Sequence, residues 1–455
     1  MLAAQHFAIT SHLSDCSMSA ALCNPAMEEG SSIGSEPARM SGAGVRSLLH
    51  FLRSGTLEDS GSQFQRQSWD WRAFAEACGA HQLTPFVYCR LQSLPENAVP
   101  PGLLEYLRER SYEITANNYR LADRLVSLIS RLRSEGIPTL AYKGPAVAMS
   151  VYGGLTRRQY QDLDMVVHKE HLAKTATLLT SWGFRPTPTP ALPQLAPYLC
   201  DPNKPSHLAR GQEIPFCAPD KTYYVDMHWQ LGDLFWRSFS PAVERLWERA
   251  ETLSLPQGSV SSLCREDLFL ALCAHGTRHR WVHLKWLVDV AELLGGSETM
   301  DWARVEEMVR IRPGTADSVS VAAILVRELL GADLPAQVER VFPPTSRSLT
   351  VARAIQEEIV RDGQSGGHEH TTFLALQRSV KERAKYRIAR TIHYPEALFR
   401  QAIVEISDKD RNLVRLPPGF QFLYHVVRPA RLVANIAPFR RRSANVSPSR
   451  NSITR

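Results

Sequence analysis

The spacing of apolar residues changes twice along this chain, and the changes predict three regions. From about 45 to 135, apolar residues recur every three or four positions, as they do in amphipathic helices. Over 136–235 the spacing switches to short or alternating runs that are typical of strands, separated by short helical stretches. From 236 to 435 helical spacing dominates again. The pattern predicts an α+β chain, with a small α/β core between two helical regions.

Three strands are expected in the core. Residues 137–142 (IPTLAY) form a short apolar run that is typical of a buried strand, and residues 162–167 (DLDMVV) form a second. Residues 221–231 (KTYYVDMHWQL) alternate and predict a third strand, with Val225, Met227 and the later odd positions facing the core.

Two helices are expected between these strands. The first spans 143–154, where Pro145 suits the first helical turn, and the second spans 169–184, where Gly183 marks the C-terminal end. A proline-rich loop follows over 186–205.

Both ends of the chain lack the pattern of a folded domain. Residues 1–44 are rich in Ser, Ala and Gly without periodicity, and we expect them to be disordered. The net charge of +7 arises in the C-terminal extension, because nine arginines and no acidic residue follow Asp410, so the rest of the chain is about neutral. Residues 436–455 are expected to form a basic disordered tail. Residues 420–442 mix apolar residues with arginine, which fits a last packed helix broken at Pro429 or, as the alternative, a segment on an anionic membrane surface.

Cysteine usage and hydropathy indicate a cytoplasmic protein. None of the eight cysteines forms a CxxC pair, which suits reduced thiols. The N-terminus has no basic segment followed by an apolar one, so no signal peptide is expected. The longest apolar run, 319–326, is far shorter than the roughly 20 residues of a membrane span.

Two aspartates at the start of the second strand are the strongest candidates for chemistry. Asp162 and Asp164 are two residues apart and therefore project from the same face of a strand. Asp226, on the third strand, shares a face with His228. Three carboxylates on neighbouring strands repel one another unless a hard cation such as Mg²⁺ lies between them, so the pattern predicts a site for one or two metal ions. The alternative is a solvated strand edge.

Positive charge is expected beside these carboxylates. Lys143 and Gly144 precede a helix whose N-terminal end would point at an anion, and Arg158 adds a second charge. Gly144 also fits a turn residue with positive φ, and Arg157 fits a surface position.

Three histidines recur every fourth residue at 275, 279 and 283, which would place them on one helical face. They could chelate zinc, but we favour a polar stripe that faces the cleft or a domain interface. Trp281, Trp286 and Leu287 are expected in the core. The glycine-rich 366–370 segment (GGHEH) is interpreted as a solvated loop rather than a metal site.

The segment LAYKGPAVAMSVYGGLTRRQYQDLDMVV resembles the signature of the uncharacterised nucleotidyltransferase family in the polymerase-β-type superfamily. That signature is a strand, Lys-Gly, a helix ending in Tyr, then Arg and Asp-x-Asp before an apolar strand. The matching residues here are Lys143, Gly144, Tyr152, Arg158, Asp162 and Asp164. The VDMHW segment (225–229) resembles the later D-x-H-W strand, and 270–294 resembles a helical segment with His, Trp and Asp. The resemblance covers roughly 65–295.

The resemblance implies a small mixed-sheet nucleotidyltransferase core over 136–235. It also implies that a nucleoside monophosphate moves from a nucleoside triphosphate such as ATP to a hydroxyl acceptor on a small molecule, peptide or protein. One or two Mg²⁺ ions would be the cofactor. Asp162, Asp164 and Asp226 would be catalytic and would bind the metal. The nucleotide would be bound by Lys143, Gly144, Arg158 and His228.

One departure from the wider superfamily supports a rival hypothesis. Where that superfamily has Gly-Ser or Gly-Gly at the helix start, Pro145 follows Gly144 and has no amide hydrogen for a phosphate. The chain could therefore be a catalytically degenerate binding or scaffold protein. A second rival, a transferase acting on RNA, is disfavoured by the near-neutral body, since affinity for a phosphate backbone needs clustered Lys and Arg.

Overall fold

A computed structural model describes residues 42–53, 69–94, 98–187, 213–231, 245–296, 300–311 and 314–363, with 414, 423 and 424 as isolated positions. The predicted basic tail, the 366–370 loop and nearly all of the segment 420–442 lie outside the described residues. So does the predicted disordered segment up to residue 41, whereas its last residues already belong to helix α1 (Gly42–Arg53).

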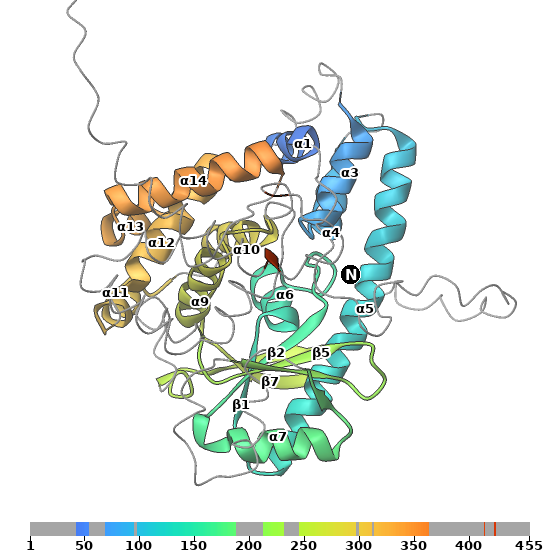
Figure 1. The fold of residues 1–455 in the computed structure, drawn as a ribbon, viewed down its shortest axis with the longest axis vertical. Helices are drawn as coiled ribbons and strands as arrows, with labels where there is room; N and C mark the ends of the chain where they lie inside the picture. The colour runs from blue at the N-terminus through green and yellow to red at the C-terminus, as the bar shows by residue number, and fades with distance from the viewer. Residues whose placement is uncertain are drawn as a thin grey trace, which may run out of the picture. The chain divides into compact units, whose positions relative to one another are not determined.

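Seven strands form one mixed sheet in the order β3-β4-β5-β2-β1-β7-β6. Figure 1 labels four of them, β1, β2, β5 and β7. β2 pairs in parallel with β5, and β1 pairs in parallel with β7, while the other neighbours are antiparallel. The strands are β1 (Thr139–Tyr142), β2 (Asp162–Val167), β3 (Arg185–Pro186), β4 (Glu213–Cys217), β5 (Tyr224–His228), β6 (Glu251–Leu255) and β7 (Gly258–Ser262). The α+β prediction and the mixed sheet are confirmed.

The central strand β2 separates an apolar face from a polar one. Leu163, Met165 and Val167 are fully buried in a core that includes Leu125 of α5 (Pro101–Ser134) and Leu179 of α7 (Leu172–Ser181). The intervening residues, Asp162 and Asp164, therefore project from the opposite face, as period-two alternation requires. That face is turned toward α6 (Gly144–Tyr152), α9 (Arg265–Arg278) and α10 (Lys285–Gly295).

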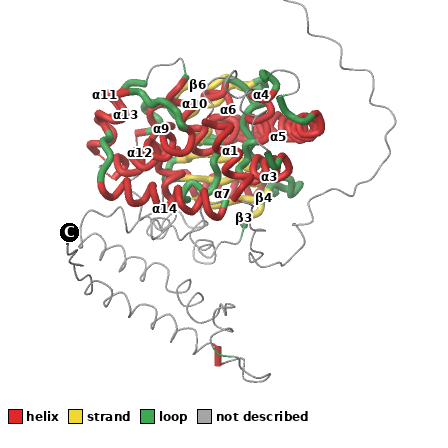
Figure 2. Tube along the Cα trace, turned by 90° about the horizontal axis from the view of Figure 1, so that it is seen from above, coloured by secondary structure: helices red, strands yellow, loops and turns green. Residues whose placement is uncertain are grey.

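Helices from both ends of the sequence pack into one further core. α1 (Gly42–Arg53) lies near α3 (Trp71–Ala80) and α14 (Ser346–Asp362), and buried residues from all three belong to a single apolar cluster. Seen from above in Figure 2, the strands lie among the helices. The other helices are α4 (Thr84–Leu91), α5 (Pro101–Ser134), α6 (Gly144–Tyr152), η1 (Lys169–His171), α7 (Leu172–Ser181), α9 (Arg265–Arg278), α10 (Lys285–Gly295), α11 (Trp302–Ile311), α12 (Gly314–Leu325), η5 (Val326–Leu330) and α13 (Ala336–Val341).

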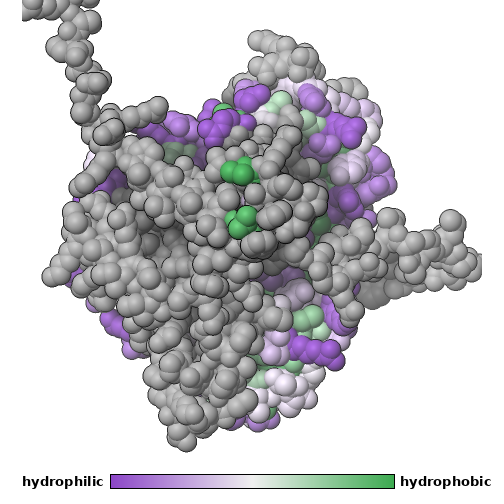
Figure 3. All heavy atoms as spheres, in the orientation of Figure 1, coloured by the Kyte–Doolittle hydropathy of each residue, from purple (hydrophilic) through white to green (hydrophobic). Residues whose placement is uncertain are grey.

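The long helix α5 packs one face on the sheet and carries charged residues on the other. Its outer pairs include Arg108 with Glu105 at 2.5 Å and Arg110 with Glu113 at 2.8 Å. Hydrophilic residues accordingly colour much of the visible edge near this helix in Figure 3. No helix in the described ranges has the length and apolarity that crossing a membrane would require.

Four strands were not expected from the sequence. β6 and β7 form a hairpin at 251–262, inside the stretch expected to be helical, and β7 joins the sheet beside β1. β6 is a largely exposed edge strand of five residues, and the alternation of Leu253 and Leu255 is too short to identify it within a stretch of helical spacing. β3 and β4 flank the loop predicted at 186–205. The three expected strands and the two expected helices are present but shorter by a few residues, except that β2 matches its prediction in full.

A buried histidine connects three helical segments. His81, at the end of α3, is 0% exposed; its Nε2 donates to the carbonyl of Gly363 at 2.8 Å, and its Nδ1 accepts from the amide of Leu284 at 3.2 Å. This pattern requires the neutral imidazole. Burial lowers the pKa of His81 to about 4, because a charged ring would lose both hydration and one of its two partners.

We predict that His81 makes stability depend on pH. Its folded-state pKa of about 4 lies below the unfolded value of 6.5, so its contribution is complete above pH 6.5 and is lost as the pH falls toward 4. The free energy of unfolding should fall by about 3 kcal/mol over that interval through this residue alone. Denaturant unfolding of wild type and His81→Gln from pH 7 to 4 measures it, since glutamine does not titrate. The variant should show the shallower slope, and His171→Gln, at a partly exposed position, should keep the wild-type slope. Equal slopes in all three proteins would refute the assignment.

Candidate active site

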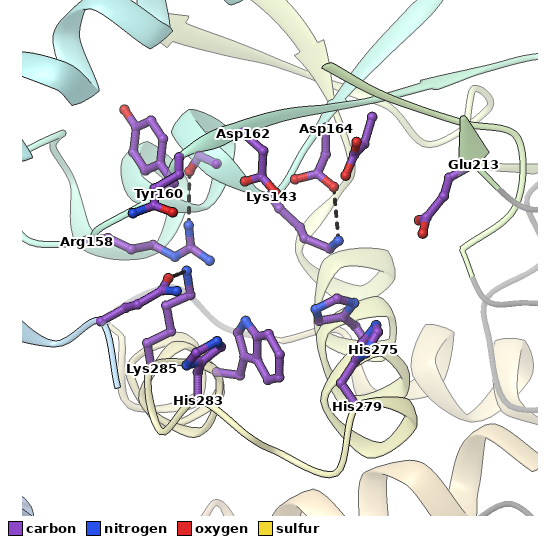
Figure 4. Close-up of a pocket in the computed structure, with 15 residues that line it drawn as sticks. Lys143, Arg158, Tyr160, Asp162, Asp164, Glu213, His275, His279, His283 and Lys285 are labelled. Carbon is purple, nitrogen blue, oxygen red and sulfur yellow. Dashed lines mark hydrogen bonds and ion pairs between the residues drawn. The ribbon is translucent and has the colours of Figure 1, made fainter. Parts of the chain in front are cut away.

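A cavity of about 300 Å³ lies on the polar face of the sheet, and it brings together most of the predicted site residues (Figure 4). One wall comes from the strands and the turn before α6. The opposite wall comes from the end of α9 and the start of α10. The lining includes six of the seven predicted residues, which are Lys143, Gly144, Arg158, Asp162, Asp164 and Asp226. His228 lies directly behind this wall, bonded to Asp164.

The register of β2 and β5 sets the carboxylates side by side. Asp164 stands opposite Asp226 in this parallel pair, while Asp162, the first residue of β2, stands opposite Tyr224. A ligand atom from each of Asp164, Asp226 and His228 lies within 4.8 Å of the others. Two carboxylate oxygens and a ring nitrogen at this spacing can share a cation, whereas the predicted ligand Asp162 lies outside this group.

Lys143 reaches Asp164 from a strained turn. Its Nζ lies 3.0 Å from Oδ1 of Asp164. Its backbone has φ 52° and ψ −148°, a region that costs a side-chain-bearing residue about 1–3 kcal/mol. Gly144 follows with φ 41°, and a Cβ there would lie 3.3 Å from the carbonyl oxygen of Asp162. The close approach of this turn to β2 brings the ammonium onto the carboxylate.

His228 bridges two carboxylates. Its Nε2 lies 2.9 Å from Oδ1 of Asp164, and its Nδ1 lies 3.1 Å from Oε2 of Glu213. Carboxylates only accept, so both ring nitrogens act as donors when both acids are ionised. Glu213 faces His228 across the β4–β5 ladder and also lies 3.6 Å from Arg278. The geometry makes His228 an orienting group for Asp164.

Burial and charge act differently on the three aspartates. Burial alone would raise the pKa of Asp164, but Lys143 and His228 outweigh it and hold that pKa below its usual range. Burial, and then the charge of Asp164, raises the pKa of Asp226 to about 7 and also raises the pKa of Asp162. Burial likewise opposes the charge on Lys143, yet Asp164 outweighs it and raises the lysine pKa. The cluster therefore holds more carboxylates than its local cations neutralise.

Arg158 makes a bidentate ion pair beneath the cavity. Its Nε and Nη2 donate to the two oxygens of Asp289 at 2.8 Å each, and the hydroxyl of Tyr152 donates to the same carboxylate at 2.8 Å. Asp289 is 0% exposed and belongs to α10. The remaining Nη1 of Arg158 points to the carbonyl of Gly144 at 3.4 Å. The pair thus anchors the helical wall to the turn that carries Lys143.

The three histidines are not on one continuous helix. α9 ends at Arg278, and positive φ angles of 54° at Arg280 and 53° at Trp281 break the chain before α10. Trp281 packs so closely on Gly276 that a Cβ there would lie 2.4 Å from its ring, which explains the break.

All three histidines nevertheless line the cavity, as a polar wall around Trp286. Among the described residues, only Asp164, Asp226 and His228 meet the spacing of a metal site, so the zinc alternative has no support. Trp281 and Leu287 are core residues as predicted, whereas Trp286 is only partly buried and faces the cavity.

Several polar residues that line this cavity were not expected from the sequence, among them Glu213 and Gln82. Glu213 starts β4, and its segment EIPFC alternates Ile214 and Phe216 before a turn and β5, a hairpin pattern that was visible in the sequence. Gln82 comes from the turn between α3 and α4 and reaches the cavity from a distant part of the chain. No local pattern marks it.

We predict that the Arg158–Asp289 pair is required for stability. Asp289→Asn leaves a buried guanidinium without its countercharge, and loss of one partner of a buried pair costs about 3–5 kcal/mol. Glu292→Gln is the matched control on the same helix, since its pair with Arg157 at 3.6 Å is about one third exposed and should contribute less than about 1 kcal/mol. Denaturant unfolding of both variants measures the free energy of unfolding. Similar small losses of this free energy in both variants would show that the Arg158–Asp289 pair does not hold α10 against the turn before α6.

Comparison with known proteins identifies the family of this chain. A family model described as uncharacterised nucleotidyltransferase matches residues 67–331. The chain is also similar to the crystal structure of an antigenic nucleotidyltransferase-like protein from Paracoccidioides brasiliensis, with 15% identity and a TM-score of 0.27 over 50% of this chain and 97% of that one. No curated protein matches the chain. Because the family model spans more than half of the sequence, the protein belongs to the uncharacterised nucleotidyltransferase family.

Proposed function

We propose that the protein transfers a nucleoside monophosphate from a nucleoside triphosphate to a hydroxyl acceptor in a Mg²⁺-dependent reaction. The observation that carries the proposal is the convergence of Asp162, Asp164 and Asp226 with Lys143 on one wall of a cavity. Family membership supports the class of reaction. The acceptor would be a hydroxyl on a small molecule, a peptide or a protein.

The donor set fits a hard divalent cation. Burial, and then the charge of Asp164, raises the pKa of both Asp162 and Asp226, and a cation would relieve the repulsion between these carboxylates. We assign the metal-binding role to Asp162, Asp164 and Asp226. Both nitrogens of His228 already face carboxylates, which favours an orienting role for it over a ligating one. A bound Mg²⁺ would supply charge neutralisation to the phosphates.

The remaining residues would act on the phosphates and the acceptor. Asp226 would accept the proton of the attacking hydroxyl at a carboxylate oxygen. Lys143 would donate to phosphate oxygens, and Gly144 would let the chain approach them closely. Arg158 would contribute through its Nη1, because its other two donor nitrogens are engaged by Asp289.

One observation favours the second candidate, a catalytically degenerate binding protein. Pro145 lacks an amide hydrogen, and the next two amides, of Ala146 and Val147, already donate to the carbonyl of Lys143 at 2.8 and 3.2 Å. The start of α6 therefore offers phosphate few backbone donors. An active enzyme would have to rely on side-chain cations instead.

We predict Mg²⁺-dependent nucleotide binding that requires the aspartate pair. Calorimetry with ATP, GTP, CTP and UTP, each with and without Mg²⁺, should show binding of at least one nucleotide to wild type. Asp162→Asn/Asp164→Asn should weaken that binding at least about tenfold, since it removes two charged ligands.

The matched control for this experiment is Asp123→Asn, at an exposed aspartate of α5. It should bind as wild type does. If folded wild type binds no nucleotide, or if the double variant binds equally well, the metal-site assignment fails and the degenerate alternative takes its place.

We predict that Mg²⁺ can replace the charge of Lys143. Lys143→Met leaves Asp164, which is 3% exposed, without its ammonium partner and should cost about 1–3 kcal/mol of unfolding free energy. Millimolar Mg²⁺ should restore most of the loss, because a ligand that binds only the folded state stabilises it. Thermal unfolding with and without Mg²⁺ measures this. The double variant Lys143→Met/Asp164→Asn should not respond; an equal response there would place the ion elsewhere.

A further inference from the structure

A second lysine lies in the cavity on the wall opposite the aspartates. Lys285 begins α10, is 9% exposed, and has its ammonium inside the cavity (Figure 4). Its Nζ donates to Oε1 of Gln82 and to the carbonyl of Gln159 at 3.2 Å. Both acceptors are neutral oxygens, whereas the acceptor of Lys143 is a carboxylate. The two cavity lysines are therefore solvated by the protein in different ways.

The partner Gln82 is held in an unfavourable backbone conformation. It has φ 58°, which is uncommon for a residue with a side chain, and it stands in the turn between α3 and α4. This turn belongs to the N-terminal helices, Gln159 to the loop before β2, and Lys285 to the C-terminal helices. Three parts of the chain thus converge on one ammonium group, and the strain at Gln82 is tolerated where its amide oxygen meets that group.

The positive charge of Lys285 is in excess over negative charge on this wall of the cavity. Its neighbour Arg158 is matched by Asp289 at 2.8 Å. Among the residues that the structure describes, no carboxylate forms an ion pair with Lys285. A buried cation without such a partner is unfavourable, and burial lowers the pKa of Lys285 to about 8. An anion that enters the cavity would restore the missing countercharge. The carboxylates at the opposite wall would repel this anion unless a cation screened their charge.

We propose that Lys285, oriented by Gln82, binds the terminal phosphates of the nucleoside triphosphate donor and makes the site selective for triphosphates over monophosphates. The inference rests on the proposed function and adds the direction in which the donor lies. The phosphate that reacts would lie near Asp162 and Asp164, and the two that leave as pyrophosphate would extend toward α10. A triphosphate in this direction would bridge the sheet and the helical wall.

Calorimetry with ATP, AMP and inorganic tripolyphosphate, all with Mg²⁺, tests the proposal on the full chain. Lys285→Met should weaken the binding of ATP and tripolyphosphate at least about tenfold and that of AMP less than about twofold. Lys169→Met, at an exposed lysine, should leave all three unchanged. Gln82→Gly keeps the lysine and suits the positive φ, so it should fold and show a smaller loss that is still specific to triphosphates.

The outcomes separate this inference from the proposed function. If wild type binds ATP but Lys285→Met loses ATP and AMP equally, or loses neither, the inference is overturned and the function stands. If wild type binds tripolyphosphate through Lys285 but binds none of ATP, GTP, CTP and UTP, the polyphosphate site stands and the proposed function fails. If wild type binds none of these probes, both are overturned. Circular dichroism of each variant shows that a loss is not a loss of fold.

Discussion

The structure of this site follows from one constraint, the presence of a carboxylate in the middle of a buried sheet. Asp164 is almost fully buried on the central strand, where an ionised group is stable only with charged or hydrogen-bonding partners. Lys143 and His228 both contact the same oxygen of Asp164. The strained backbone of Lys143 is explained by this need, since a relaxed turn would direct its side chain elsewhere. Glu213 in turn fixes His228 from the neighbouring strand.

A second buried pair determines how the sheet and the helices meet. Asp289 of α10 accepts from Tyr152, at the end of α6, and from Arg158, in the loop that leads into β2. The interactions of Asp164 and those of Asp289 lie on opposite sides of the turn at Gly144, and Arg158 reaches the carbonyl of Gly144. The cavity therefore has walls from separate chain regions, but each wall is tied to the same turn. A ligand between them meets groups whose positions are already fixed, which reduces the entropy lost on binding.

The sequence predicts the carboxylate wall well and the opposite wall poorly, for identifiable reasons. Alternation along β2 and β5 is a period-two pattern, so the shared face of Asp162, Asp164 and Asp226 could be inferred before the strands were seen. The helical spacing of the sequence continues through Arg280 and Trp281, but the helix ends before them. The break depends on the contact of Trp281 with Gly276, which the spacing does not reveal. Gln82 joins the site through tertiary packing alone, which leaves no periodic signal in the sequence.

The distribution of charge favours a small polyanion over a nucleic acid as the ligand. The excess of arginine lies after Asp410, and the remainder of the chain is about neutral. Arg158, which lines the cavity, is paired with Asp289, and Arg278 lies 3.6 Å from Glu213. Of the described residues that line the cavity, Lys143 and Lys285 therefore supply the positive charge for a ligand. Binding along a phosphate backbone needs many such contacts over an extended surface. Two lysines on facing walls, with carboxylates beside one of them, instead suit one short phosphate chain together with a divalent cation.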